Sequence, residues 1–278
     1  MNLLDQAIYC ADKVTTVSPT YAQEICQPQY GFGLDGLLRS KGQNLVGIVN
    51  GLDTASYDPQ HDPCLAANYS AKDLSGKKVC KRHLLERFGL PVDEAPLLGV
   101  VSRLDFQKGM DLVLQSIYDI MTYSDFKLVI LGSGDKDLES AVNWAAGRYP
   151  QRVACYIGFN SSLARTVYAG SDMFLMPSLF EPCGLSQMIA MRYGTLPIAR
   201  ATGGLVDTIK DNFHGRGTGY LFGEYSVEAL LTALGKAQEH YVYCPELWHN
   251  TQVRAMESDF SWARSAAKYK ELYLRCRS

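Results

Sequence analysis

The sequence predicts an α/β fold built on a doubly wound, Rossmann-like parallel sheet. From residue 97 onward, short apolar runs alternate with longer stretches of helical periodicity. The apolar runs are continuous, as expected for strands that are covered on both faces. Glycine-rich and polar segments follow several of these runs, at the carboxyl ends of strands where such sheets bind ligands. Together these observations favour a parallel sheet flanked by helices on both sides.

The first quarter of the chain is less regular than the rest. Two apolar runs are predicted to be strands, Val14–Ser18 and Leu45–Val49, and a turn at 50–53 ends the second. Tyr30–Gly36 is rich in glycine and aromatic residues, so we expect a loop there. Thr54–Ser75 is polar, contains prolines and has no period, which is typical of a connecting segment.

Helices and strands alternate through the middle of the chain. The expected helices are Lys77–Phe88, Met110–Met121, Leu138–Arg148, Ser162–Ala169, Leu185–Met191 and Leu205–Lys210. The expected strands are Leu97–Val101, Lys127–Leu131, Val153–Ile157, Met173–Met176 and Leu196–Ala199. Three helical stretches without intervening strands end the chain: Val227–His240, Leu247–Met256 and Trp262–Leu274. Ser261 is expected to be the N-cap of the last helix.

Composition limits the classes of protein to which the chain can belong. Its 278 residues include 27 Lys and Arg against 29 Asp and Glu, without a long basic run, so a nucleic-acid partner has no support. No apolar run is long enough to cross a membrane bilayer. The eight cysteines form no C-x-x-C pair, so a zinc ribbon or thioredoxin motif has no support. A reducing compartment such as the cytoplasm fits this cysteine usage.

The segment around Glu181 carries the strongest functional signal. It follows the strand Met173–Met176 and reads Glu181-Pro182-Cys183-Gly184-Leu185-Ser186. Pro182 keeps Glu181 out of the helical region, and Gly184 allows a ligand to approach the backbone. The free N–H groups at the start of the following helix favour an anion. A carboxylate beside an anion site suggests a ligand with a phosphate and hydroxyl groups, and the alternative is a carboxylate that caps the helix.

Two cations, Arg103 and Lys108, flank the end of the strand Leu97–Val101. Fixed cations there can neutralise a diphosphate, and they stabilise the charge that develops on it when it is a leaving group. The alternative is a pair of surface cations. Because strand ends of a parallel sheet share one edge, Glu181 at another strand end strengthens the functional interpretation.

Weaker candidates lie at other strand ends. Thr202-Gly203 opens a helix, and its N–H groups suit a phosphate or sugar oxygen, although a plain glycine turn has almost as much support. Phe159 can stack on a base or be an ordinary core or lid residue. Cys183 is interpreted as a ligand-lining residue because no base accompanies its thiol. Asp135 is expected to cap a helix and not to bind a metal.

A set of short segments spread along the chain forms a specific pattern. It comprises Ala11-Asp12, Ser18-Pro19-Thr20-Tyr21, Val49-Asn50-Gly51-Leu52-Asp53, Ser102-Arg103-Leu104, Gln107-Lys108-Gly109, Glu181-Pro182-Cys183-Gly184-Leu185, Tyr193-Gly194-Thr195-Leu196-Pro197, Thr202-Gly203-Gly204-Leu205 and Asp259-Phe260-Ser261-Trp262. Through these segments the chain resembles, over nearly its whole length, the bacterial glycogen synthase and plant starch synthase family of glycosyltransferases.

The resemblance implies a GT-B fold and transfer of glucose from ADP-glucose to the non-reducing end of an α-1,4-glucan, with retention of configuration. Arg103 and Lys108 match the family's diphosphate-binding cations, and Glu181 matches its active-site glutamate. The donor-binding backbone is matched by Gly184-Leu185-Ser186 and Thr202-Gly203. Phe159 falls where the family has an aromatic residue near the adenine. The resemblance implies no metal and no other cofactor.

The resemblance also implies a domain organisation. Members of the family are much longer, so we expect the C-terminal domain of a GT-B fold with most of the N-terminal domain missing. Residues 1–49 are assigned to a remnant of that domain, 50–258 to the nucleotide-sugar donor domain, and 259–278 to a helix that packs back on the N-terminal domain. The chain alone is therefore expected to bind the donor weakly and to lack transferase activity.

Other functions stay open at the level of the sequence. The main alternative is a non-catalytic module that binds a nucleotide sugar or a glucan. A GT-B epimerase is disfavoured by the synthase-like segments, and a dehydrogenase by Gly132-Ser133-Gly134, which lacks the third glycine of the dinucleotide motif. The expected location is the cytoplasm, or the plastid for a plant protein.

Overall fold

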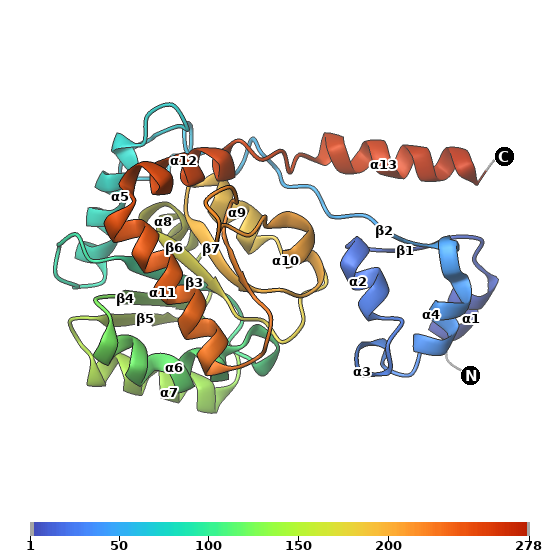
Figure 1. The fold of residues 1–278 in the computed structure, drawn as a ribbon, viewed down its shortest axis with the longest axis horizontal. Coiled ribbons are helices and arrows are strands. Elements are labelled where there is room, and N and C mark those ends of the chain that lie inside the picture. The colour runs from blue at the N-terminus through green and yellow to red at the C-terminus, as the bar shows by residue number, and fades with distance from the viewer. Residues whose placement is uncertain (1–2, 277–278) are drawn as a thin grey trace.

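A six-stranded parallel sheet forms the centre of the computed structural model, which describes residues 3–276 (Figure 1). Its strands are β3 (Leu97–Val101), β4 (Lys127–Gly132), β5 (Val153–Ile157), β6 (Met173–Met176), β7 (Leu196–Arg200) and β8 (Tyr220–Phe222). They lie in the order β5-β4-β3-β6-β7-β8, and each neighbouring pair is parallel. The predicted fold class is confirmed, whereas β8 was not predicted.

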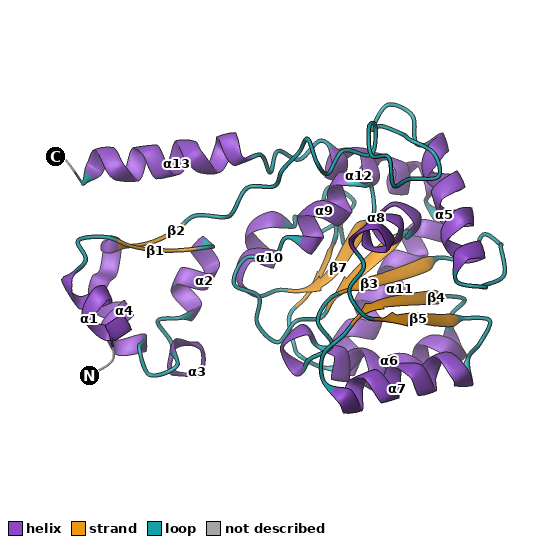
Figure 2. Ribbon diagram, turned by 180° about the vertical axis from the view of Figure 1, so that it is seen from behind, coloured by secondary structure: helices purple, strands orange, loops and turns teal. Residues whose placement is uncertain are grey.

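Helices cover both faces of this sheet. They are α5 (Ser75–Arg87), α6 (Met110–Tyr123), α7 (Lys136–Arg148), α8 (Ser161–Gly170), α9 (Ser186–Arg192), α10 (Gly203–Thr208), α11 (Val227–Tyr243) and α12 (Pro245–Met256). α11 lies in front of the sheet in Figure 1, and α8 lies in front of it in the opposite view of Figure 2. The sheet and its helices therefore form the doubly wound arrangement that the sequence predicts.

Neighbouring residues of the central strands pack into different cores. Leu97, Val129 and Leu131 belong to a cluster with buried side chains of α5 and α8. Leu98 and Ile130 belong to a larger cluster that includes buried side chains of α6 and α11. Because successive strand residues point to opposite faces, continuous apolar strands are required where both faces are buried.

The first residues form a separate small unit, which we call the N-terminal unit (residues 3–49). Its elements are α1 (Leu3–Cys10), β1 (Val14–Thr16), α2 (Pro19–Glu24), α3 (Pro28–Gly31), α4 (Asp35–Lys41), the 3-10 turn η1 (Gly42–Asn44) and β2 (Leu45–Gly47). Ile8, Ile25 and Leu38 form its core. The loop expected at Tyr30–Gly36 is therefore partly wrong: α3 starts with a proline in its first turn and ends at Gly31, and α4 begins at Asp35.

Two chain segments cross side by side between the N-terminal unit and the sheet. The Leu52 N–H donates to the Phe260 carbonyl at 2.6 Å, and the Ser265 hydroxyl donates to the Val49 carbonyl at 2.7 Å. The last helix, α13 (Trp262–Arg275), then runs away from the sheet toward the N-terminal unit (Figure 1). Ser261 occupies its N-cap position, but its side chain makes no cap hydrogen bond, which corrects the expected role.

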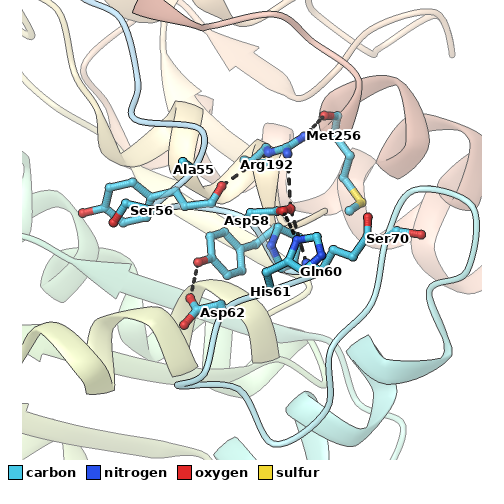
Figure 3. Close-up of polar contacts among 12 residues, drawn as sticks. Ala55, Ser56, Asp58, Gln60, His61, Asp62, Ser70, Arg192 and Met256 are labelled. Atoms are coloured by element: carbon cyan, nitrogen blue, oxygen red, sulfur yellow. Dashed lines mark hydrogen bonds and ion pairs between the residues drawn. The ribbon is translucent and has the colours of Figure 1, made fainter.

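The connecting segment between β2 and α5 is irregular, as predicted, and two arginines anchor it; Figure 3 shows one of them, Arg192, with Asp58 and Asp62 of the segment. Arg165 of α8 donates to the buried Asp62 carboxylate at 2.9 Å, and the Tyr193 hydroxyl donates to the same carboxylate. Arg192 of α9 donates to Asp58 at 3.2 Å. These ion pairs fix the segment against α8 and α9. We call residues 50–258 the sheet domain.

Candidate functional site

The candidate site lies where the strand order reverses. From β3 the chain continues to β4 and β5 on one side, while β6, β7 and β8 lie on the other. The loops that follow β3 and β6 are therefore neighbours at the carboxyl edge of the sheet. Open α/β sheets bind ligands in the crevice at such a reversal. The loop after β3 carries Arg103 and Lys108, and the loop after β6 carries Glu181.

Lys108 and Glu181 form an ion pair at this place. The Lys108 Nζ lies 2.6 Å from the Glu181 Oε2, and the Ser178 hydroxyl donates to the same oxygen at 3.1 Å. Glu181 is only 4% exposed. Within residues 3–276, both side-chain contacts of Glu181 fall on Oε2, which leaves Oε1 as an acceptor for a further group.

The position of Lys108 depends on its neighbours in the chain. It ends the short 3-10 turn η2 (Phe106–Lys108), where the Asp105 carboxylate accepts from the Lys108 N–H at 2.9 Å. Gly109 follows with φ +72°, and a Cβ on this residue would lie 2.1 Å from the Pro177 carbonyl oxygen. The absence of a side chain therefore allows the loops after β3 and β6 to touch.

Arg103 lies in the same loop but is much more exposed. Its side chain is 64% accessible, and it pairs with Asp105 at 2.7 Å and with Gln107 at 3.1 Å. The Arg103 guanidinium thus pairs within its own loop and does not join the ion pair between Lys108 and Glu181. Two cations of different exposure are available at the edge of the sheet: Lys108, half-buried against Glu181, and Arg103, exposed at the rim.

The backbone of the Glu181 loop is held by two side chains that the sequence analysis missed. The buried Arg200, at the end of β7, donates to the Ser178 carbonyl at 2.8 Å and to the Leu179 carbonyl. Gln107 donates to the Phe180 carbonyl at 3.4 Å. An arginine that ends an apolar strand is the signal that could have identified the first of them, because a charged side chain is buried only with partners.

The turn from Cys183 to Ser186 is more closed than expected. α9 begins at Ser186, without a side-chain cap. Gly184 adopts φ +70°, and the Gln187 amide donates to the carbonyls of Cys183 and Gly184 at 3.1 and 3.0 Å. Cys183 is buried, and burial raises the pKa of its thiol. The side chain of Cys183 thus packs in the core, so of this residue only the backbone remains as a candidate for contact with a ligand.

Thr202 and Gly203 already have partners in this structure. The Glu24 carboxylate of the N-terminal unit accepts from the Gly203 N–H at 2.9 Å and from the Thr202 hydroxyl at 3.0 Å. The next N–H group, on Gly204, donates to the Glu181 carbonyl at 2.9 Å. The donors that the sequence assigned to a ligand are therefore occupied by an acidic side chain.

Two remaining candidates have different outcomes. The Phe159 side chain is 90% exposed just after the edge strand β5, so the alternative of a core residue is excluded. Asp135 accepts from the N–H groups of Asp137 and Leu138 at 2.9 and 3.1 Å, so its predicted role as a helix cap is confirmed. In the described part of the chain, His, Cys, Asp and Glu side chains nowhere gather in threes that could hold a metal ion.

Comparisons with known proteins give a consistent relationship. The family model described as glycosyl transferases group 1 matches residues 83–247, and the model described as starch synthase catalytic domain matches residues 1–40. The glycogen synthases of Streptococcus gordonii and Lactiplantibacillus plantarum are 47% and 49% identical to the chain, over 98% of its length. The chain spans 58% and 57% of these two relatives.

Solved structures agree with the sequence comparisons. The catalytic domain of starch synthase IV from Arabidopsis thaliana, bound to ADP and acarbose, superposes with a TM-score of 0.92 at 39% identity. That match covers 98% of this chain and 57% of the plant chain. A sucrose-phosphate synthase from Thermosynechococcus elongatus shares the fold, with a TM-score of 0.66 at 21% identity. That match covers 98% of this chain and 60% of the sucrose-phosphate synthase chain. The chain therefore belongs to the group 1 glycosyl transferases, as a relative of the glycogen and starch synthases.

Proposed function

We propose that this chain provides the donor-binding part of a glycogen or starch synthase. In this proposal the whole enzyme transfers glucose from ADP-glucose to the non-reducing end of an α-1,4-glucan, with retention of configuration. The observation that carries the proposal is the ion pair between Lys108 and Glu181 at the reversal of the strand order. The starch synthase relative, whose structure holds ADP and acarbose, supports a nucleotide and a glucan as ligands.

The cations can bind the diphosphate of the donor. Lys108 has three N–H donors, and Glu181 uses one of them, so the others can reach phosphate oxygens. Arg103 is exposed at the rim and can bind a second phosphate in a bidentate manner. When the bond between glucose and the diphosphate breaks, both cations stabilise the negative charge that develops on the leaving group.

Glu181 is suited to the sugar. Its Oε2 is held by Lys108 and Ser178, so the carboxylate has a fixed orientation and can accept sugar hydroxyls through Oε1. The backbone of Gly184, Leu185 and Ser186 supplies N–H groups beside it, and Phe159 offers an exposed ring to the adenine. No metal is required for these contacts, so we expect nucleotide binding to persist in EDTA.

The site is one wall of a cleft, so the chain alone should bind donor without efficient transfer. Transfer needs the acceptor held against the donor and water excluded. We assign residues 50–258 to the donor domain, and 1–49 and 259–278 to parts that contact a further N-terminal domain.

All eight cysteines are free thiols, which supports a reducing cytoplasm as the location. Among residues 3–276, none of the helices combines the length and apolar character that a membrane crossing needs.

Two measurements test the proposal: calorimetric titration with ADP, UDP, ADP-glucose and maltoheptaose, and an assay of ¹⁴C-glucose transfer from ADP-glucose to glycogen. We expect ADP and ADP-glucose to bind, UDP to bind more weakly, and ¹⁴C-glucose transfer to glycogen to stay at background. Absence of binding to every nucleotide would reject the proposed donor site. Rapid transfer by this chain alone would instead show that one wall of the cleft is sufficient.

A further inference from the structure

Two carboxylates join the N-terminal unit to the sheet domain. Asp207, in α10, accepts from the Thr20 N–H at 3.0 Å, from the Thr20 hydroxyl at 2.7 Å and from the Ser18 hydroxyl, at the start of α2. Glu24, at the end of α2, accepts from Gly203 and Thr202 at the start of α10. Each helix therefore supplies the acid that caps the other, and α2 packs against α10.

These contacts lie directly behind the Glu181 loop. The Gly204 N–H, next to the N–H that Glu24 holds, donates to the Glu181 carbonyl at 2.9 Å. A Cβ on Gly203 would lie 2.0 Å from the same carbonyl oxygen. In addition, the ring of Phe32 meets that of Phe180, in the Glu181 loop, edge-on, with centroids 6.2 Å apart. The N-terminal unit thus touches the Glu181 loop directly through Phe32, and indirectly through the contact of Glu24 with Gly203.

Phe32 itself has a strained backbone. Its φ of 50° is the only positive value for a residue other than glycine between residues 3 and 276. Non-glycine residues adopt this region at a cost, and such strain persists where the surroundings enforce it, often at functional sites. The side chain is also largely exposed. Phe32 is the C-cap of α3, where helices commonly end on a left-handed residue, and its ring makes the contact with the Glu181 loop.

The two caps are strong contacts, and breaking them would also expose polar groups that are buried between the two units. Hydrogen bonds from N–H groups to a carboxylate are charge-assisted. Ser18 and Thr202 are buried, and Glu24 Oε2 is enclosed without a hydrogen-bond partner within the described chain. A desolvated carboxylate oxygen without a partner is costly, so this arrangement is stable only while the caps hold the two units together.

We propose that Glu24 and Asp207 are positioning residues that hold the N-terminal unit against the Glu181 loop. Through Gly203 and Gly204 they set the place of Glu181 relative to the sugar of a bound nucleotide sugar. Thr202 and Gly203 then serve this interface and do not bind the donor. The part of the proposal that concerns the sugar rests on the proposed function, whereas the contact between the two units does not.

Hydrogen exchange of the whole chain, followed by mass spectrometry, tests the contact. In Glu24→Ala and Asp207→Ala we expect amides of 202–208 and of the Glu181 loop to exchange roughly fivefold faster. In the double variant these amides should exchange faster than in either single variant. The increase over wild type should nevertheless be much smaller than the product of the two single increases. Asp135→Ala is the matched control, because it removes a carboxylate cap within the sheet domain and should leave both segments unchanged. Unchanged exchange in both single variants would overturn the proposal.

A second measurement separates positioning from simple stability. We expect the ratio of the dissociation constants for ADP-glucose and ADP to rise roughly threefold in Glu24→Ala, because only the sugar senses Glu181. Glu24→Gln keeps an oxygen for the Gly203 N–H and should restore most of the ratio, and it serves if the alanine variant does not fold. Faster exchange with an unchanged ratio would refute the positioning role. If wild type binds neither nucleotide, the proposed function fails, while the exchange data still decide the contact.

Discussion

Lys108 and Glu181 are joined by an ion pair of 2.6 Å, although 73 residues separate them in the chain. The pair brings together the loops after β3 and β6, which are adjacent only because the strand order reverses between these strands. Glu181 is nearly fully buried, so the ammonium group offsets the cost of removing a carboxylate from water. The same ammonium group is the one expected to meet the donor diphosphate.

Replacing Lys108 by methionine should weaken ADP binding by roughly tenfold or more, since a charge-assisted contact to phosphate is lost. Calorimetric titration measures the change. Lys236→Met is the matched control, because Lys236 pairs with Glu239 on the surface of α11 and should leave ADP binding unchanged. Glu181→Gln should retain most of the ADP affinity. An unchanged affinity in Lys108→Met would remove Lys108 from the donor site.

Gly109 should tolerate no side chain. In Gly109→Ala, the new Cβ would meet the Pro177 carbonyl, and the positive φ adds strain, so unfolding free energy should fall by about 1–3 kcal/mol. Displacement of Lys108 should reduce ADP binding as well. Gly147→Ala, in the last turn of α7 with no atom outside the helix's own backbone within 4 Å of the new Cβ, should instead be neutral or stabilising by up to about 1 kcal/mol. Equal effects in urea denaturation would contradict this account.

The periodic part of the sequence predicted the fold well, for a physical reason. Continuous apolar runs such as Leu97–Val101 can be buried on both faces only inside a sheet covered by helices. β8 was missed because its three residues are too short to show a period. α4 was missed because Gly36 lies in its first turn and small residues obscured the helical pattern.

The site was predicted in its parts but not in its contacts. The types and strand-end positions of Lys108 and Glu181 were readable from the sequence, and their ion pair follows from the strand order. The cap that Glu24 places on Gly203 was not readable, since it depends on how a distant unit packs on the sheet domain. The role of Arg200 was missed for the same reason, because its partners are backbone carbonyls of another loop.

Lys77 should give stability an unusual dependence on pH. Its ammonium is buried, donating to the carbonyls of Ala169 and Tyr193 and to the Thr195 hydroxyl, and burial lowers its pKa to about 7. Between that value and the unfolded value of 10.5, the unfolded chain binds more protons than the folded chain. This residue therefore makes stability rise with pH in that window, by up to about 1.4 kcal/mol per unit.

Urea denaturation of wild type and Lys77→Met between pH 7 and 9 isolates this contribution. The difference in unfolding free energy between the two proteins should shift in favour of wild type as the pH rises. Lys236→Met, which removes an exposed ammonium, should show no such shift. A difference that stays constant over this range would mean that Lys77 is not desolvated as described.

Asp62 and Asp58 offer a comparison of two carboxylates in one connecting segment. Asp62 is buried and accepts from Arg165 and Tyr193, whereas Asp58 is partly exposed and pairs with Arg192 and His61. Asp62→Asn should lower the unfolding free energy by about 3 kcal/mol, because the Arg165 charge is left uncompensated. Asp58→Asn should cost about 1 kcal/mol or less.

The pH dependence of the Asp62 variant adds a sharper criterion. Burial acts to raise the pKa of Asp62, but hydrogen bonds from Tyr193, the Cys64 N–H and Arg165, together with the Arg165 charge, hold it below its ordinary value of 3.8. Its stabilising effect is therefore complete above that value and is lost as the pH falls through the lowered pKa. The gap between wild type and Asp62→Asn should be constant from pH 5 to 7 and narrow below pH 4. A gap that persists undiminished into acid would show that packing, and not the charge of Asp62, anchors the segment.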